Sequence, residues 1–254
     1  MKRLGLFFIT FATAVANWYV FFLIAQALKL DTPEFLATIL ILAVVVHEIG
    51  HMIVLESYGV KTYMFFAVIL GGVGPQKAYV EKFKALNWGQ ASAVALAGVM
   101  GNIVVVLGGL LCYGLGYISG WQFSQIANLN GLLIFWNLIP FGSLDGGRVA
   151  KALFDSIPEN EDGKYVFIFR ITILIGAIVL LFFNFTNVFI AFYVFFLSIK
   201  YRANNDDPNG SYSEKAMSKS EYNKWAIVYL VLFLAGLALA SVFPDWLNVK
   251  KYLN

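Results

Sequence analysis

The only two histidines of the chain, His47 and His51, stand four residues apart in the string His-Glu-Ile-Gly-His. Residues with this spacing lie on one face of a helix, so both imidazoles can reach a single metal ion. Glu48 then lies beside the metal, where a carboxylate can take a proton from an activated water and pass it to a leaving amine. The pattern H-E-x-x-H on a helix therefore predicts a catalytic zinc site.

The residues that precede this string strengthen the prediction. The three ionisable side chains follow directly on an uninterrupted apolar run, residues 39–46. Ionisable side chains inside a membrane span are costly in free energy and need a common partner. A doubly charged cation supplies that partner, so we expect a metal ion at this position.

A zinc hydrolase needs a third protein ligand and leaves a fourth coordination position for water. Glu56 is a poor candidate, because it lies five residues beyond His51 and too far along and around the same helix. Asp145 is a better candidate, because it follows Pro140 and precedes two glycines, where the chain can bend and return a side chain to a bundle. The alternative for Asp145 is an ordinary helix N-cap.

The composition places these residues in a membrane protein. Of the 254 residues, 60% are hydrophobic and only 13% are charged, and the mean hydropathy is +0.74. Soluble domains carry about 25% charged residues, so a soluble enzyme and a disordered chain are both excluded. The single Cys112 excludes a disulfide framework, and a net charge of +3 does not indicate a nucleic-acid partner.

Apolar runs near 20 residues recur along the chain and predict a polytopic α-helical membrane protein with about six to seven transmembrane helices. The predicted spans are residues 4–28, 33–56, 91–118, 126–139, 166–183, 188–199 and 225–243, with a short helix at 146–154. Residues 60–75 are too short to span, are rich in β-formers and end in glycines. They predict a short membrane-embedded β-strand or hairpin after the second helix. We expect one integral membrane domain over residues 1–254, with its catalytic core at 33–154 and C-terminal helices at 166–243.

The positive charges predict the orientation of these spans. With a cytoplasmic N-terminus, fourteen of the 18 Lys and Arg residues fall in segments on the inner side and three on the outer side. This bias predicts a multi-pass protein of the cell membrane with its N-terminus in the cytoplasm and its C-terminus on the opposite side. His47, His51 and Asp145 would then share a depth in the cytoplasmic half.

Two motifs together resemble the site-2 protease family of intramembrane zinc metalloproteases. That family's pattern pairs H-E-x-x-H, here at residues 47–51, with a later N-x-x-P, here at 137–140, followed by L-D-G-G at 144–147. The two motifs occur in this order, about ninety residues apart. Ala97-Gly98 with Asn102 also resembles the family's glycine-proline-asparagine signature, although valine stands where proline is usual.

The resemblance implies that His47, His51 and Asp145 hold one zinc ion per chain and that Glu48 is the general base. It also implies cleavage of a transmembrane segment of a membrane-bound protein near the cytoplasmic side, as in regulated intramembrane proteolysis. The implied partners are a membrane-spanning substrate, the lipid bilayer, and an upstream protease or a regulatory membrane protein, with no nucleic acid. Many family members carry a PDZ or CBS domain, and we expect a compact member without either.

Substrate contacts are predicted at four residues. A helical substrate must unwind before cleavage, and an exposed strand edge at residues 63–69 could pair with it. Phe65 and Ala67 are the candidates on this strand. Asn137 and Asn102 are further candidates, and for each the alternative is a hydrogen bond to a neighbouring helix.

Two other functions remain open on the sequence alone. A membrane zinc peptidase of the prenyl-protease type would need a glutamate as third ligand, and Glu159 and Glu161 are available. A non-catalytic metal-binding membrane scaffold is disfavoured, because Glu48 is intact.

Overall fold

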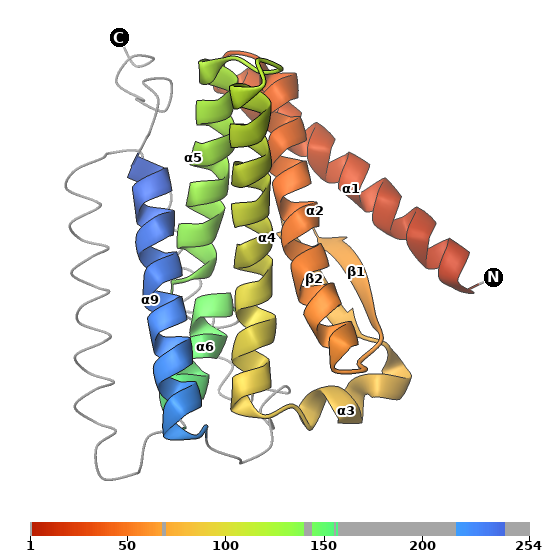
Figure 1. Ribbon diagram of the computed structural model, residues 1–254. Coiled ribbons are helices and arrows are strands. Elements are labelled where there is room, and N and C mark those ends of the chain that lie inside the picture. The colour runs from red at the N-terminus through yellow and green to blue at the C-terminus, as the bar shows by residue number, and fades with distance from the viewer. Residues whose placement is uncertain (1, 68–69, 140–143, 155, 157–216, 242–254) are drawn as a thin grey trace.

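The computed structural model of the chain describes residues 2–67, 70–139, 144–154, 156 and 217–241. The elements (Figure 1) are α1 (Lys2–Ala27), α2 (Pro33–Ser57), β1 (Thr62–Ala67), β2 (Leu70–Pro75), η1 (Lys77–Tyr79), α3 (Val80–Lys84), α4 (Trp88–Gly114), α5 (Gly120–Asn137), α6 (Asp145–Phe154) and α9 (Lys219–Ser241). The spans predicted at 166–183 and 188–199 lie outside the described residues.

Three helices of the described part are long and apolar enough to cross a membrane. They comprise Thr10–Ala27 of α1, Pro33–Ser57 and Trp88–Gly114. Helices α2, α4, α5 and α9 lie alongside one another, and the short α6 lies near the lower part of α9 (Figure 1). The protein is therefore a mostly helical membrane protein, as predicted.

Local sequence signals explain where the central helices begin and end. Pro33 opens α2, where a missing N–H costs nothing, and Gly59 with φ +73° turns the chain after its last residue. Asn87 caps α4 and Ser119 caps α5, and each side chain accepts a backbone N–H in the first turn of its helix.

Helix α5 begins six residues earlier than the apolar run predicted. It starts at Gly120 rather than at residue 126, because its first turns are polar in sequence yet helical in structure. Gln125 and Asn128 of this helix are fully buried. Hydropathy alone therefore placed the start of α5 too late, because these polar side chains face the protein interior.

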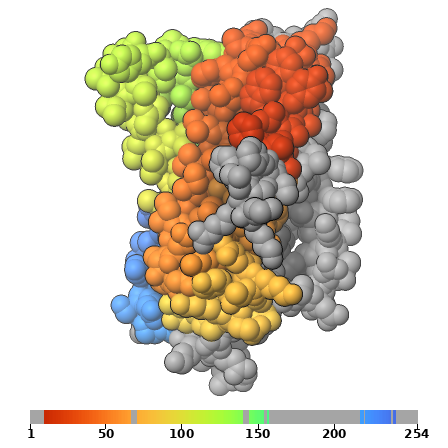
Figure 2. All heavy atoms as spheres, turned by 90° about the vertical axis from the view of Figure 1, so that its right-hand side faces the viewer, coloured from red at the N-terminus to blue at the C-terminus, as the bar shows by residue number. Residues whose placement is uncertain are grey.

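A two-stranded antiparallel sheet, the hairpin of β1 and β2, follows α2. Met64 pairs with Val73 and Phe65 with Gly72. The face that includes Gly71 packs on α2, since a Cβ at this residue would meet the Glu48 side chain. On the opposite face the Phe65 ring lies over Gly72. Figure 2 shows this side of the molecule, with the hairpin and α2 in orange above the yellow segment that contains α3.

Two hydrophobic clusters hold these elements together. The larger one joins α4, α5, α6 and α9, with Leu96, Val99, Ile134 and Val149 at its fully buried centre. The smaller cluster fixes the end of α2 to the start of α4 and the base of the hairpin, and its buried members are Leu55, Val60, Leu86 and Val94. Helix α4 thus contributes residues to both clusters.

Helices α2 and α4 approach each other closely through glycines. A Cβ at Gly50 of α2 would overlap the Ala97 carbonyl oxygen, and one at Gly101 of α4 would lie 2.6 Å from the Val46 carbonyl oxygen. Any larger residue at these positions would force the helix backbones apart, because backbone cannot rotate away as a side chain can.

We expect Gly50→Ala to lower the thermal stability of the protein, because its methyl group meets backbone. Overpacking of this kind costs about 1–3 kcal/mol, which for a chain of this size corresponds to a Tm lower by about 5 °C. Gly108→Ala is the matched control, since no other element of the described part comes within 4 Å of its Cβ position. Thermal unfolding of both variants in detergent checks this, and equal Tm values would contradict the tight contact.

Candidate metal centre

His47 and His51 meet on the inner face of α2. Both side chains are buried, and their Nε2 atoms lie 3.1 Å apart. The turn of helix between them places the two rings edge to face, with centroids 4.7 Å apart. Two imidazole nitrogens of one helix are thus directed at a common point, as the spacing predicted.

Asp145, the first residue of α6, brings a carboxylate oxygen to the same point. Its Oδ2 atom lies 3.1 Å from His47 Nε2 and 3.4 Å from His51 Nε2. One ligand atom from each of the three residues lies within 4.8 Å of the others, and all three residues are buried. The three predicted metal-binding residues therefore meet in one cluster.

The chain reaches Asp145 through a close contact with the end of α5. A Cβ at Gly146 would overlap the Leu138 carbonyl group, so only glycine fits where α6 crosses this carbonyl. The Tyr229 hydroxyl of α9 donates a hydrogen bond to the same Leu138 oxygen. Residues 140–143, which connect the two helices, lie outside the described part.

The outer nitrogens of both imidazoles have hydrogen-bond partners. His51 Nδ1 lies 2.7 Å from the Val94 carbonyl oxygen, and His47 Nδ1 lies 2.8 Å from Asn102 Oδ1. A carbonyl oxygen can only accept, so each Nδ1 carries its proton and donates. Each Nε2 atom therefore has its lone pair available for a metal, the arrangement found when imidazole ligands are oriented from behind.

The electrostatics of the cluster favour a cation. Asp145 supplies a carboxylate that faces the Nε2 atoms of both imidazoles. Two lone pairs and one carboxylate can share this buried space only with a positive charge among them. Two imidazoles and a carboxylate also form a ligand set typical of catalytic zinc, so the residues fit such a metal.

Glu48 lies next to this cluster and is itself buried, with 6% of its surface exposed. It is not one of the three converging residues. A Cβ at Gly71 of β2 would lie 2.8 Å from Glu48 Oε1, so the hairpin passes directly over this carboxylate. Glu48 therefore lies next to the three converging residues without being one of them. This position suits a general base that is not a metal ligand.

Gly98 of α4 leaves the space in front of the ligand nitrogens open. A Cβ there would lie 2.5 Å from His51 Nε2 and 2.6 Å from His47 Nε2. Its position in the Ala97-Gly98…Asn102 pattern had been noted only as a family signature. The structure supplies a physical reason, which is that any side chain at Gly98 would occupy the space of a metal ion.

The residues predicted to contact substrate lie in different surroundings. Asn102 is fully buried behind His47, and Asn137 donates from Nδ2 to the Leu133 carbonyl within α5. Phe65 is 45% exposed and lies on the hairpin face away from Glu48. Ala67 belongs to β1, but its side chain lies outside the described part. Among the described side chains of this group, Asn102 contacts the three-residue cluster, through His47.

Of the alternative metal ligands, Glu56 is exposed on α2 and is not part of the cluster. Glu159 and Glu161 lie outside the described residues. The sequence reasoning did not identify Val94, whose carbonyl has no side-chain signal, or Asn130, which bonds Asn102 from α5.

We expect Gly98→Ala to reduce divalent-metal affinity by about 100-fold or more, because the added methyl group stands against both ligand nitrogens. Co²⁺ titration followed by visible absorption measures this directly. Gly108→Ala on the same helix should leave the affinity unchanged. Unaltered Co²⁺ binding by Gly98→Ala, with the helical circular dichroism of the parent chain, would contradict the assignment of this space to a metal.

Similarity to known proteins is concentrated in about half of the chain. The chain is 34% identical over 130 residues, 50% of this chain and 33% of the relative, to "Putative zinc metalloprotease sll0528" from Synechocystis sp.. It is 28% identical over 116 residues, 45% of this chain and 33% of the relative, to "Zinc metalloprotease MJ0392" from Methanocaldococcus jannaschii. The chain thus spans about a third of the length of these curated relatives.

A solved structure, the site-2 protease from Methanocaldococcus jannaschii, matches with a TM-score of 0.41 and 18% identity, over 90% of this chain and 88% of that one. No family model matches the chain. Over about half of its length the chain is thus similar to proteins named zinc metalloproteases, the class of enzyme that its paired motifs predict.

Proposed function

We propose that the protein is an intramembrane zinc endopeptidase of the site-2 protease kind, which cleaves a transmembrane segment of a membrane-bound protein. The observation that carries the proposal is the convergence of His47, His51 and Asp145 within apolar helices, with Glu48 beside them. Relatives named zinc metalloproteases support zinc as the metal. Because the matched stretch is about a third of those relatives, the substrate and the full activity are part of this proposal.

Each residue of the site has a separate role in this proposal. The Nε2 atoms of His47 and His51 and the carboxylate of Asp145 hold one zinc ion per chain. The bound ion supplies a Lewis acid that polarises the scissile carbonyl and makes water more acidic. Glu48 takes a proton from the attacking water and delivers it to the amide nitrogen as the C–N bond breaks. The hydroxyl of that water remains on the carbonyl carbon.

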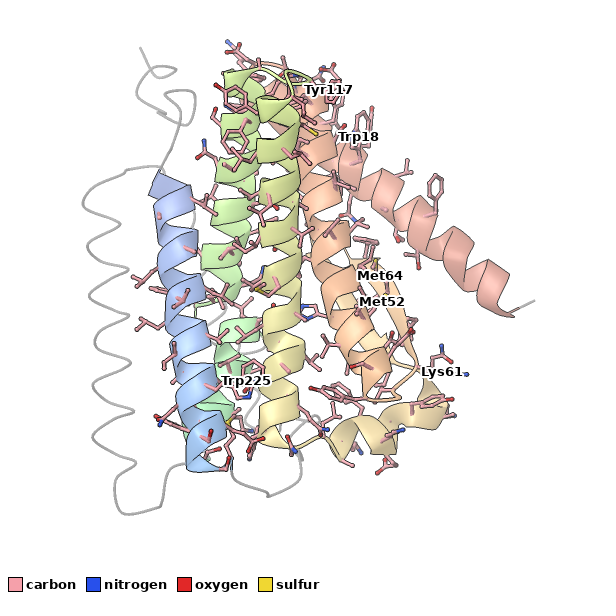
Figure 3. The ribbon with its side chains drawn as sticks, viewed as in Figure 1. Trp18, Met52, Lys61, Met64, Tyr117 and Trp225 are labelled. Carbon is pink, nitrogen blue, oxygen red and sulfur yellow. The ribbon has the colours of Figure 1, made fainter. Side chains whose placement is uncertain are left out.

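The proposed protein is a single multi-pass domain of the cell membrane with its N-terminus in the cytoplasm. Lys82 and Lys84 of α3 lie at the end of the molecule where Lys61 and Trp225 also lie, and Trp18 and Tyr117 lie toward the other end (Figure 3). Lysines on the cytoplasmic side and aromatic residues at both interfaces are typical of membrane proteins. The hairpin then lies at the depth of the cytoplasmic half of α2.

The outer edge of β1 is the proposed place where an unwound substrate pairs with the protein. The Gln76 N–H donates to the Lys61 carbonyl, so the peptide groups of Thr62, Met64 and Phe66 point away from β2. The Met64 carbonyl accepts a hydrogen bond from Thr10 of α1, 2.9 Å away. A substrate strand would form its hydrogen bonds with these outward groups of β1, since each peptide group freed by unwinding in a membrane needs a new partner.

The proposed activity implies three kinds of partner. They are a membrane-spanning protein as substrate, the surrounding lipid, and an upstream protease or a regulatory membrane protein that makes the substrate accessible. Cleavage near the cytoplasmic side would release a fragment into the cytoplasm, as in regulated intramembrane proteolysis.

We expect Glu48→Gln to lower peptide cleavage by about 10³-fold while zinc content stays near one per chain, because a base is lost and no ligand is removed. Cleavage of a generic transmembrane substrate in detergent and metal analysis of the same preparation measure the two quantities. Near-normal turnover in this variant would exclude the proposed mechanism.

Matched carboxylate variants test the ligand set in the same assays. Asp145→Ala should lose both activity and tight zinc, whereas Glu56→Ala should keep both, since Glu56 is exposed and outside the cluster. If zinc binding required Glu159 or Glu161 instead, a peptidase of the prenyl-protease type would be the better assignment.

We expect Met64→Pro to reduce cleavage by at least about fivefold, the equivalent of one hydrogen bond of about 1 kcal/mol, because proline cannot donate from the outward edge of β1. The bonds between β1 and β2 do not use this peptide group. Met64→Ala is the control and should keep its activity, because its N–H remains. Equal activity of the two variants, with zinc content intact, would argue against strand addition and leave the protease assignment in place.

A further inference from the structure

A chain of side-chain amides links α5 to the metal cluster through α4. Asn130 Oδ1 accepts a hydrogen bond of 3.0 Å from Asn102 Nδ2, and Asn102 Oδ1 lies 2.8 Å from His47 Nδ1. Both asparagines are fully buried. Helices α2, α4 and α5 thus share one line of hydrogen bonds that ends at His47.

The direction of this line is determined by two backbone carbonyls. Asn130 Nδ2 donates to the Ile126 carbonyl, 2.8 Å away, and a carbonyl can only accept. The amide oxygen of Asn130 must therefore face Asn102. The Ala43 carbonyl, 3.1 Å from Asn102 Nδ2, sets the same orientation for the second amide.

The orientation of the Asn102 amide determines which nitrogen of His47 carries the proton. With both hydrogens of Asn102 Nδ2 directed at Ala43 and Asn130, only its oxygen can face His47. His47 Nδ1 must then donate, and the ring is held with Nε2 toward Asp145. Outer partners of this kind fix ring orientation and raise the basicity of a metal-bound imidazole.

We infer that Asn130 is a positioning residue for the metal centre, which acts on His47 through the amide of Asn102. The inference rests on the proposed function in one respect, namely that His47 holds the metal. It assigns α5 a part in metal binding, although no residue of α5 belongs to the three-residue cluster. Asn102 accordingly acts from behind His47 and does not contact substrate.

Asn128 provides a matched comparison for Asn130 on the same helix. It is also fully buried, but its amide atoms have no hydrogen-bond partner among the described residues. Replacement of either asparagine by leucine removes a buried amide from α5. Only the replacement at Asn130 breaks the line to His47.

The test uses the full chain in detergent, loaded with zinc and labelled with ¹⁵N only in histidine. Because the chain has two histidines, the spectrum contains two Nδ1–H groups, that of His47 bonded to Asn102 and that of His51 bonded to the Val94 carbonyl. In Asn130→Leu we expect the His47 signal to shift and to exchange faster with water, while the His51 signal stays unchanged. Zinc affinity, measured by chelator competition, should fall by about 10- to 100-fold.

Two further variants separate positioning from simple packing. Asn130→Asp keeps an oxygen toward Asn102 and, with its second oxygen protonated, a donor toward the Ile126 carbonyl, so it should restore most of the affinity and the His47 signal. Asn128→Leu should leave both quantities as in the parent chain. If Asn130→Leu fails to fold by circular dichroism, Asn130→Ser replaces it, with Asn128→Ser as its control.

The outcomes decide between the possibilities. Parent-like affinity and spectra in Asn130→Leu, equal effects in Asn128→Leu, or equal shifts of both histidine signals would each overturn the inference. A parent chain that binds zinc with these signals but cleaves no peptide would overturn only the proposed function. A parent chain that binds no zinc would overturn both.

Discussion

Two imidazole lone pairs and one carboxylate meet inside a set of apolar helices. The rest of the structure depends on how the repulsion among these three groups and the free-energy cost of burying them are offset. Desolvated polar atoms of this kind are costly unless each has a partner. On the outer side the partners are fixed, since the Val94 carbonyl holds His51 and the Asn102 amide holds His47. On the inner side a cation is the remaining partner, and it offsets the repulsion among all three ligands at once.

The need for space at this point explains the glycines that surround it. Gly98 keeps α4 clear of the ligand nitrogens, and Gly50 lets the two helix backbones approach closely enough for Asn102 and Val94 to reach the imidazoles. Gly71 allows the hairpin to lie against Glu48. Helices α2 and α4 and strand β2 thus each carry a glycine at a close contact around the metal-binding residues. Larger residues fill the two hydrophobic clusters.

Much of this arrangement was predictable from local rules. The spacing of His47 and His51 sets their common face, and Pro140 with the two glycines after Asp145 predicted the return of Asp145 to the bundle. The hairpin followed from a short run of β-formers that ends in glycines. What could not be predicted depends on helix rotation and on backbone atoms. The Val94 carbonyl has no signature in a sequence, and a polar α5 residue such as Asn130 shows its partner only when three helices are in place.

The buried polar residues of α5 have a consequence for how the protein is made. Gln125, Asn128 and Asn130 would meet lipid if α5 entered the bilayer alone, and each such amide opposes partitioning into hydrocarbon. Helix α4 is far more apolar, is separated from α5 by a short turn, and carries the Asn102 amide that bonds Asn130. Helix α5 is therefore suited to leave the insertion machinery together with α4 as a preformed helical pair, so that the bond between the two asparagines is made before either amide is exposed to lipid.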